Sequence, residues 1–195
     1  MPSGSAGSGS ERADAVLVGR HASLRAIASS DIDWLREAET ASPHSLRWRL
    51  AGEMIAPDRY PSSLFDGVLA TFVFEGSKAG CRGLVSAYSA DTRNGFAYVA
   101  VSRLESGSSA LANALVAADG FRLFVDYLFQ GWPFRKLYLE CAQFNIGQFG
   151  KMLGSLRSEG CLVDHVFLDG RYWDLMIYSI LRDEWPSIRN LGLHG

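Results

Sequence analysis

Three strand-like runs followed by one long amphipathic segment occupy the middle of this chain and restrict the folds it can adopt. The runs are rich in β-branched and aromatic residues and cover residues 69–75, 81–89 and 96–103. Short polar segments separate them, and the second segment ends in Asn94-Gly95, a dipeptide typical of tight hairpin turns. The pattern predicts an antiparallel meander of three strands.

The segment after the meander has the period of a helix. Between residues 108 and 129, apolar side chains recur every three or four positions, as on one face of a helix. These positions are Leu111, Leu115, Ala118, Phe121, Val125 and Leu128. Asp119, Arg122 and Asp126 line the opposite face. We therefore expect one long amphipathic helix.

Shorter elements are expected on both sides of this centre. Before it, residues 16–27 resemble a strand, Ser30 to Asp33 has the spacing of a capped helix start, and Ser42-Pro43 predicts a second helix. The prolines at 57 and 61 mark a loop. The elements expected after the long helix are a strand over 136–142, a short helix over 145–155, and strands over 161–168 and 173–181. The last strand is apolar on both faces, so it should lie inside a sheet covered on both sides.

This order of elements predicts an α+β fold, in which a mixed, mostly antiparallel central sheet carries helices on both faces. One domain is expected over residues 15–185, because 195 residues with 48% hydrophobic and 21% charged side chains suit a globular protein. Residues 1–10 are mostly serine and glycine, so residues 1–14 are expected to form a flexible tail. Residues 186–195 are expected to form a C-terminal tail.

Charge and cysteine content exclude several function classes. The net charge is -2 and the basic residues are scattered, so nucleic acid is not expected as a partner. No apolar stretch approaches the roughly 20 residues of a membrane helix, and we expect a cytoplasmic protein without a membrane partner. Cys81, Cys141 and Cys161 form no CxxC pair, so we expect reduced thiols and no metal site.

The most specific pattern lies toward the C-terminus. Asp126-Tyr127-Leu128-Phe129 ends the long helix, Lys136-Leu137-Tyr138-Leu139 begins the next strand, and Asn145 follows that strand. A further block runs from Glu159-Gly160 through residues 164–174 to residues 178–185. With these residues the chain resembles the GNAT superfamily of acyl-CoA-dependent N-acyltransferases, most nearly the ribosomal-protein N-terminal acetyltransferases.

The resemblance implies a GNAT-like fold with acetyl-CoA or another acyl-CoA as cosubstrate. The acceptor would be a primary amine, either a protein N-terminus or a small metabolite, that attacks directly in a ternary complex. In the family the pantetheine arm lies between two diverging strands, here at Val99, Ala100 and Val101, and an asparagine like Asn145 bonds it. Phe149 stands where the family often has a tyrosine acid, and we place it in the cofactor site.

Two registers are open for the diphosphate loop that the family places at the start of the long helix. Counting back from Phe129 puts residues 112–115 there, without glycine, which would leave a degraded site. Alternatively, residues 105–110 form the loop, with Gly107-Ser108-Ser109 at the helix entry and Arg103 supplying charge. We favour the second register, because small residues, hydroxyls and free N–H groups suit a phosphate.

The proton acceptor has several candidates. The family often has a glutamate near the start of the strand before the gap, and residues 94–96 contain no acid. Asp91, Glu105, Tyr98 and His165 remain, and we select His165 and Tyr98 as the catalytic candidates. An imidazole has a pKa of about 6.5, which suits a base near neutral pH. On its strand His165 shares a face with apolar side chains, which also suits a packed core residue.

The family builds its acceptor wall before the meander, where this chain has Trp34, Trp48 and Tyr60. These aromatic residues suit either substrate contacts or an ordinary core. A homodimer is also compatible with the resemblance. A second hypothesis is a GNAT-fold protein without catalytic activity that binds an acyl-CoA or an acyl carrier protein, because the family's glycines and its glutamate are missing.

Overall fold

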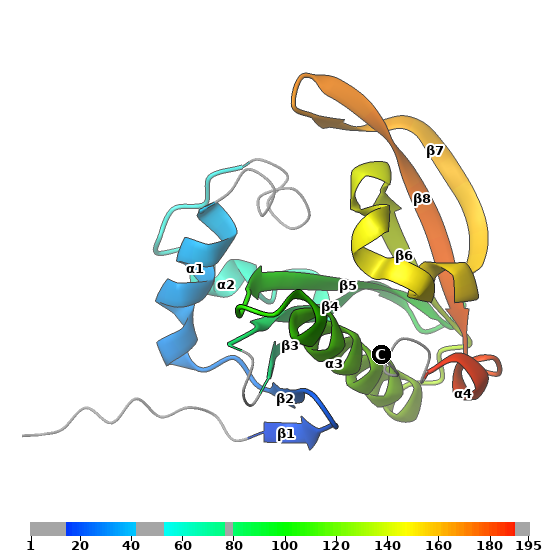
Figure 1. Cartoon of the computed structure of the whole chain (residues 1–195), viewed down its shortest axis with the longest axis horizontal. Coiled ribbons are helices and arrows are strands. Elements are labelled where there is room, and N and C mark those ends of the chain that lie inside the picture. The colour runs from blue at the N-terminus through cyan, green and yellow to red at the C-terminus, as the bar shows by residue number, and fades with distance from the viewer. Residues whose placement is uncertain (1–14, 42–52, 77–79, 190–195) are drawn as a thin grey trace, which may run out of the picture.

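An eight-stranded sheet forms the centre of the molecule (Figure 1). This computed structural model describes residues 15–41, 53–76 and 80–189, and of residues 148–152 only the backbone. The strands are β1 (Ala15–Val18), β2 (Ser23–Arg25), β3 (Val68–Glu75), β4 (Arg82–Asp91), β5 (Phe96–Glu105), β6 (Lys136–Ala142), β7 (Arg157–Leu168) and β8 (Arg171–Leu181). Their order is β1-β2-β3-β4-β5-β6-β8-β7, and all neighbours are antiparallel except β5 and β6.

Helices cover both faces of the sheet, as the sequence predicts. They are η1 (Ser29–Asp31), α1 (Ile32–Thr40), α2 (Tyr60–Ser63), α3 (Ala110–Gly131), η3 (Gln143–Ser155) and α4 (Trp185–Ile188). α3 and η3 share a core with Phe74 and Val85, whereas α1 and α2 pack with Val73 and Leu84. Because neighbouring residues of a strand point to opposite faces, the two cores lie on opposite sides. None of the described helices is long and apolar enough to cross a membrane.

The predicted meander and long helix are confirmed. β3, β4 and β5 follow the three predicted runs, and Gly95 takes a φ of 70° in the turn between β4 and β5. β6 covers the predicted strand at 136–142. β7 and β8 form a hairpin through Asp169 and Gly170, which take φ values of 50° and 77°. Local sequence therefore determines these elements.

The single strand predicted for residues 16–27 is wrong. The chain turns back at Gly19, whose N–H donates to the carbonyl of Ala22, and β1 pairs antiparallel with β2. A Cβ added at Gly19 would lie 2.3 Å from Oδ2 of Asp119 on α3. The turn is thus fitted to a helix far along the chain, which the local pattern of residues 16–27 does not show.

The polar face of α3 contacts other parts of the protein. Asp119 is 0% exposed and accepts hydrogen bonds from the N–H groups of His21 and Ala22. Further along the helix, Asp126 accepts a hydrogen bond from the indole of Trp185, at the start of α4. The two carboxylates therefore tie the β1–β2 turn and the C-terminal helix to α3. α4 includes the first residues of the segment predicted as a C-terminal tail.

Other predictions before the meander have mixed outcomes. A helix begins near Ser30 as predicted, but it is the carboxylate of Asp31 that accepts the N–H of Ala28 and two N–H groups of the Arg25 guanidinium. α2 occupies part of the loop predicted at 57–61. Residues 42–52, the body of the helix predicted from Ser42, lie outside the described residues, as does the predicted tail over 1–14.

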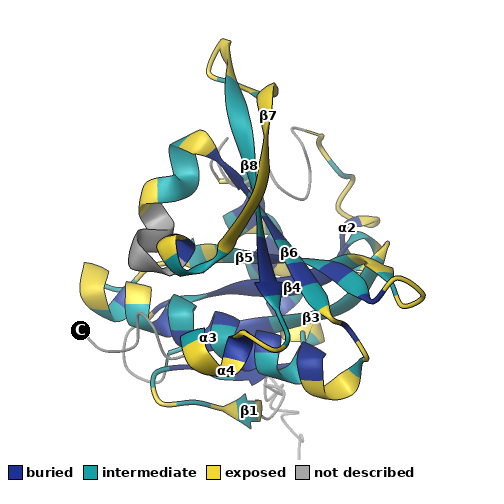
Figure 2. Cartoon of the chain, turned by 90° about the vertical axis from the view of Figure 1, so that its right-hand side faces the viewer, coloured by how far each residue is buried: buried dark blue, intermediate teal, exposed yellow. Residues whose placement is uncertain are grey.

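β8 lies inside the sheet between β6 and β7, as predicted, but most of its residues are not buried. Ser179 and Ile180 are its buried residues, and most of the others are half-buried. β7 forms the sheet edge and is exposed along most of its length (Figure 2). The apolar run of residues 175–181 therefore indicates an interior strand without indicating full burial.

Replacing Asp119 by alanine should lower the free energy of unfolding by about 3 kcal/mol, because His21, Ala22 and Arg122 lose their acceptor inside the protein. Burial by itself raises the pKa of Asp119, but the hydrogen bonds from His21, Arg122 and Ala22 outweigh it and hold the pKa below its usual 3.8. The contribution of Asp119 to the free energy of unfolding is therefore complete well above its usual pKa of 3.8, and it is lost as the pH falls through the lower pKa of the folded state.

Denaturant unfolding at neutral pH measures the loss of stability in Asp119→Ala. The same measurement at about pH 3 shows how far that loss shrinks as the pH falls. Asp66→Ala, at an exposed carboxylate after α2, is the control and should change the free energy of unfolding by less than about 0.5 kcal/mol. Equal losses in the two variants at neutral pH would contradict the anchoring role of Asp119.

Candidate functional site

The parallel ladder between β5 and β6 stops partway along both strands. Its last pair joins Val99 to Leu139. Beyond that pair, β5 stays paired with β4 and β6 stays paired with β8, but no described strand lies between the two facing edges. Val99 is thus the last paired residue of the predicted pantetheine site, and Ala100 and Val101 lie where the strands have separated.

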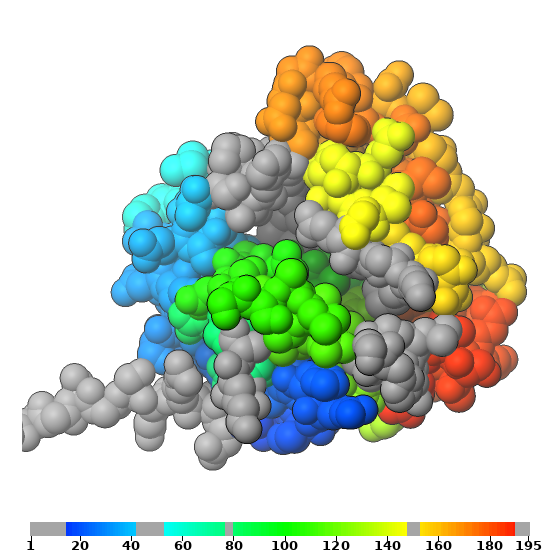
Figure 3. Space-filling model, viewed as in Figure 1, coloured from blue at the N-terminus to red at the C-terminus, as the bar shows by residue number. Residues whose placement is uncertain are grey.

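The two halves of the sheet diverge from this point. Figure 1 shows β6, β7 and β8 rising away from the plane of β3, β4 and β5. Val99 and Leu139 belong to the core beneath α3, so Tyr98 and Glu140, their neighbours along the strands, point to the opposite face. In the space-filling view, the green surface of α3 and the yellow surface of η3 lie on either side of a recessed area (Figure 3).

The segment between β5 and α3 is held by the side chain of Asn113. α3 follows its N-cap Ser109, whose hydroxyl accepts the N–H of Ala112 at 3.3 Å. Asn113 is 5% exposed, and its amide both accepts the N–H of Gly107 and donates to the carbonyl of Gly107, each at 2.9 Å. The helix entry therefore lies at residues 105–110, as the second register has it, and residues 112–115 lie within α3.

Charged side chains surround this helix entry. Arg103 is exposed on β5, and it lies close enough to Cys81 for its charge to oppose in part the rise that burial causes in the pKa of that thiol. Glu105, one of the proton-acceptor candidates, forms an ion pair with Arg82. The Arg82 guanidinium also lies 3.9 Å from the ring centre of Trp34 on α1. The charge of Glu105 is therefore matched by Arg82, and Arg103 adds positive charge to the entry.

Four aromatic rings gather on the face opposite α3, where β5 and β6 are still paired. Tyr98 stacks on Tyr138 with ring centres 5.2 Å apart, and Tyr88 and Phe96 lie 5.7 and 6.3 Å from Tyr98. The Tyr88 hydroxyl donates to Oε2 of Glu140 at 3.3 Å. A carboxylate thus lies beside this aromatic cluster, at the point where the strands separate.

Glu140 is the candidate that sequence reasoning missed. It is half-buried and is the first residue of β6 beyond the last ladder pair. The family's glutamate belongs to the strand before the gap, whereas this acid lies on the strand after it. The signal was available, since Glu140 is the one acid in residues 136–142 and shares its strand face with Tyr138.

Tyr98 lies in the middle of the aromatic cluster. Burial, followed by the negative charge of Glu140 and the neighbouring Tyr138, raises the pKa of Tyr98 above its usual 10. The phenol therefore keeps its proton at neutral pH. Tyr98 can therefore act as a proton donor. Residues 94–96 contain no acid, and Glu140 is the carboxylate that can act as the proton acceptor in their place.

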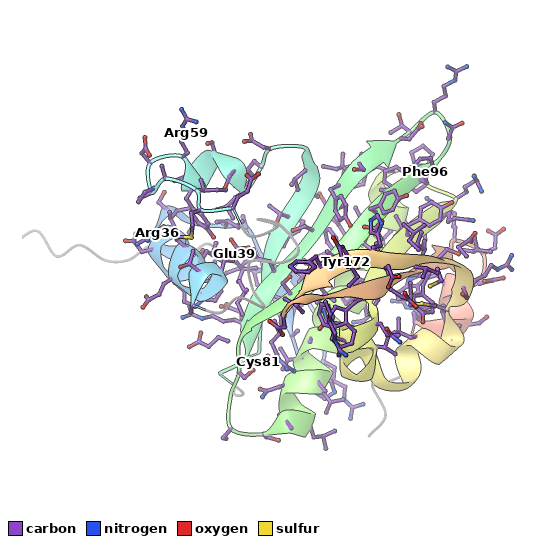
Figure 4. The ribbon with its side chains drawn as sticks, turned by 90° about the horizontal axis from the view of Figure 1, so that it is seen from above. Arg36, Glu39, Arg59, Cys81, Phe96 and Tyr172 are labelled. Atoms are coloured by element: carbon purple, nitrogen blue, oxygen red, sulfur yellow. The ribbon has the colours of Figure 1, made fainter. Side chains whose placement is uncertain are left out.

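His165 is not placed beside Tyr98. It is exposed, and it lies in the irregular stretch of β7 between the pairs of Leu162 and Val166 with β8. β6 ends opposite Leu175, which pairs with Leu162, so this part of the hairpin extends beyond β6. Seen from above, the β7–β8 hairpin, which carries Tyr172, passes in front of the central strands (Figure 4). His165 therefore belongs neither to a core nor to the aromatic cluster.

Two predicted cofactor residues lie on η3, directly after β6. Asn145 is half-buried in its first turn, so it follows the divergent end of β6. Phe149 lies further along the same helix, where the structure describes the backbone alone. Asp91, the remaining acid candidate, belongs to the β4–β5 turn, where it accepts the backbone N–H and the side-chain amide of Asn94.

The predicted substrate residues divide between core and surface. Tyr60 is 1% exposed and its hydroxyl donates to Oε2 of Glu39 at 2.5 Å, inside the core beneath α1 and α2. In this structure Tyr60 is therefore a core residue. Trp34 is half-buried at the edge of the same core, and Trp48 lies outside the described residues.

The cysteines carry no disulfide, and two of them are buried. Cys81 and Cys141 are buried and Cys161 is exposed, all three as free thiols. Burial raises the pKa of Cys141 to about 11. Within the ranges that the structure describes, no group of three or more His, Cys, Asp and Glu side chains is placed to hold a metal ion.

No protein-family model and no curated sequence matches this chain. Solved structures are similar over most of its length. A GCN5-related N-acetyltransferase from Brucella melitensis is 21% identical with a TM-score of 0.64, covering 90% of this chain and 82% of its own. RimL, a ribosomal L7/L12 alpha-N-protein acetyltransferase in complex with coenzyme A, is 14% identical with a TM-score of 0.69, covering 87% and 99%. Mycobacterium smegmatis RimJ in complex with CoA-disulfide is 17% identical with a TM-score of 0.66, covering 88% and 87%.

The chain has the GNAT fold. At identities of 14 to 21%, the similarity of these structures establishes the fold alone. It confirms the architecture expected from the sequence. Two of these GNAT-fold structures hold coenzyme A or its disulfide. In this GNAT-fold chain, the separated strands, the helix entry and the Tyr98–Glu140 cluster are the features that a ligand could use.

Proposed function

We propose that this protein is an acyl-CoA-dependent N-acyltransferase, which moves an acetyl or other acyl group to a primary amine by direct attack in a ternary complex. The observation that supports it most is the ladder that ends at Val99 and Leu139, partway along the strand that leads into the entry of α3. Unpaired strand edges suit the amides of a pantetheine arm, and a helix entry suits a diphosphate. A GNAT-fold relative, RimL, was solved with coenzyme A.

The pantetheine arm and the diphosphate of an acyl-CoA each have matching residues in this arrangement. The free backbone edge at Ala100 and Val101 would bond the pantetheine amides as a neighbouring strand would. The Gly107-Ser108-Ser109 entry would face the diphosphate, where the helix dipole favours negative charge, and Arg103 would add a cation. Asn145, which follows the other separated strand, is the residue that the family resemblance places against the arm.

The amine would approach from the face opposite α3. An α-amine has a pKa of about 7.7–8.0 and must lose a proton before it attacks. Glu140 would accept that proton, the nitrogen would bond to the thioester carbon, and the carbon–sulfur bond would break to release the CoA thiolate. Tyr98 would then donate the proton that converts the thiolate to a thiol, and its phenolate would take up the second proton that the nitrogen loses as the amide forms. Positioning and backbone N–H groups near the oxyanion would supply most of the rate.

The acceptor class follows from the same chemistry. A protein α-amine is favoured over a lysine amine, because its pKa is lower by about 2.5 and less proton removal is needed at neutral pH. A small amine metabolite remains within the proposal. Both acceptors and the acyl-CoA donor suit a cytoplasmic protein.

Calorimetric titration should show that acetyl-CoA or a longer acyl-CoA binds the purified chain, and thiol release should depend on an added amine. The amine panel contains peptides with free N-termini and small polyamines. The matched control is the same peptide with a blocked N-terminus, which has no nucleophilic amine and should release no thiol above background.

Two other outcomes are informative. Binding of acyl-CoA without thiol release on any amine would favour the second hypothesis, a GNAT-fold module that binds acyl-CoA or an acyl carrier protein. Failure of every CoA thioester to bind would contradict the transferase and the acyl-CoA form of the second hypothesis.

Replacing Glu140 by glutamine should lower kcat at neutral pH by about 100-fold, because an amide of the same shape cannot accept the proton of the amine. The affinity for CoA should stay within about twofold, since Glu140 lies on the face opposite α3. The control is Glu37→Gln, at an exposed position on α1, which should retain full activity. A Glu140→Gln enzyme with wild-type kcat would exclude Glu140 as the base.

A further inference from the structure

Asn113 fixes the conformation of the loop at the entry of α3. Its amide binds both polar backbone groups of Gly107, accepting from the N–H and donating to the carbonyl, each at 2.9 Å. The side chain is nearly enclosed, since Asn113 is 5% exposed. Two hydrogen bonds to one residue, made from inside the protein, leave the backbone at Gly107 little freedom.

A second contact holds the same region from the side of β4. Cys81 is 1% exposed, and its Sγ lies 3.7 Å from the backbone carbonyl oxygen of Asn113. A Cβ added at Gly80 would lie 3.7 Å from Cα of Gly107, so the chain leading into β4 packs against the loop. Figure 4 shows Cys81 near the loop that leads into α3. The loop is therefore held between α3 and the beginning of β4.

The bonds of Asn113 determine which N–H groups remain for a ligand. The N–H of Gly107 is already used by Asn113. The first helical hydrogen bond runs from the N–H of Asn113 to the carbonyl of Ser109. The N–H groups of Ser109, Ala110 and Leu111 therefore have no acceptor within the helix.

We propose that Asn113 is a positioning residue for acyl-CoA, which shapes the helix entry so that the N–H groups of Ser109, Ala110 and Leu111 meet the diphosphate. This role rests on the proposed function, in which the entry of α3 binds acyl-CoA. A glycine-rich loop reaches a phosphate through backbone freedom and the absence of side chains. This chain has one glycine in residues 105–110, and the amide of Asn113 holds that glycine in place. A side chain from within the helix thus replaces the additional glycines.

The test compares two thioester donors in Asn113→Ala. The affinity for acetyl-CoA should fall about tenfold, which corresponds to about 1.4 kcal/mol. S-acetyl-pantetheine carries the same thioester arm without the diphosphate, and its kcat/KM should change by less than about twofold. Asn94→Ala is the matched control, because the amide of Asn94 stabilises a turn at the far end of β5. It should leave the values for both donors unchanged.

The outcomes separate this inference from the proposed function. If wild-type protein binds acetyl-CoA and folded Asn113→Ala binds it equally well, the positioning role is wrong and the proposed function stands. Equal losses with both donors would indicate general damage to the site and would also overturn the positioning role. If the wild-type protein binds no CoA thioester, the proposed function fails and this inference fails with it.

A second measurement uses the wild-type chain, so it does not depend on whether the Asn113→Ala variant folds. In amide exchange by NMR, the N–H of Gly107 should exchange slowly, because Asn113 binds it inside the protein. Titration with CoA should shift the signals of Ser109, Ala110 and Leu111, and S-acetyl-pantetheine should leave them in place. Rapid exchange at Gly107, or CoA-induced shifts confined to other residues, would overturn the proposal.

Discussion

The arrangement of this protein depends on where the backbone pairing between β5 and β6 ends. The parallel ladder joins the two halves of the sheet up to Val99 and Leu139, and each strand then stays with its other neighbour. α3 spans the join, because its side chains share one core with residues of both strands. The halves are thus held together at one end and open at the other. The proposed acyl-CoA site uses this opening, since the ladder between β5 and β6 leaves strand edges unpaired there.

Buried polar side chains position the segments around that opening. Asp119 holds the β1–β2 turn, and Asp31 pairs with Arg25 at the start of α1. Asn113 holds Gly107 at the entry of α3. In each case a side chain with more than one acceptor or donor binds backbone groups or a charge that burial would otherwise leave unsatisfied. Apolar packing joins the layers, and these polar contacts determine where the loops between them lie.

The candidate site was only partly predictable. The resemblance to the GNAT superfamily implied the diverging strands at Val99, and the small residues before the long helix favoured a helix entry at Gly107. Glu140 was missed although it is the one acid in residues 136–142, because its relation to Tyr88 spans β4 to β6 and only the structure shows it. His165 was selected for its chemistry, yet the hairpin carries it beyond the end of β6.

The sequence by itself determined the meander, the long helix, the strand at 136–142 and the final hairpin. Their signals are local. Apolar side chains alternate along a strand and recur every three or four residues in a helix, and glycine marks turns that need a positive φ. Only the tertiary structure decided that Gly19 begins a turn, that Asp119 is buried, and that Glu140 lies near enough to Tyr98 for its charge to act on that phenol. Those outcomes depend on contacts between residues far apart in the chain, which no local period records.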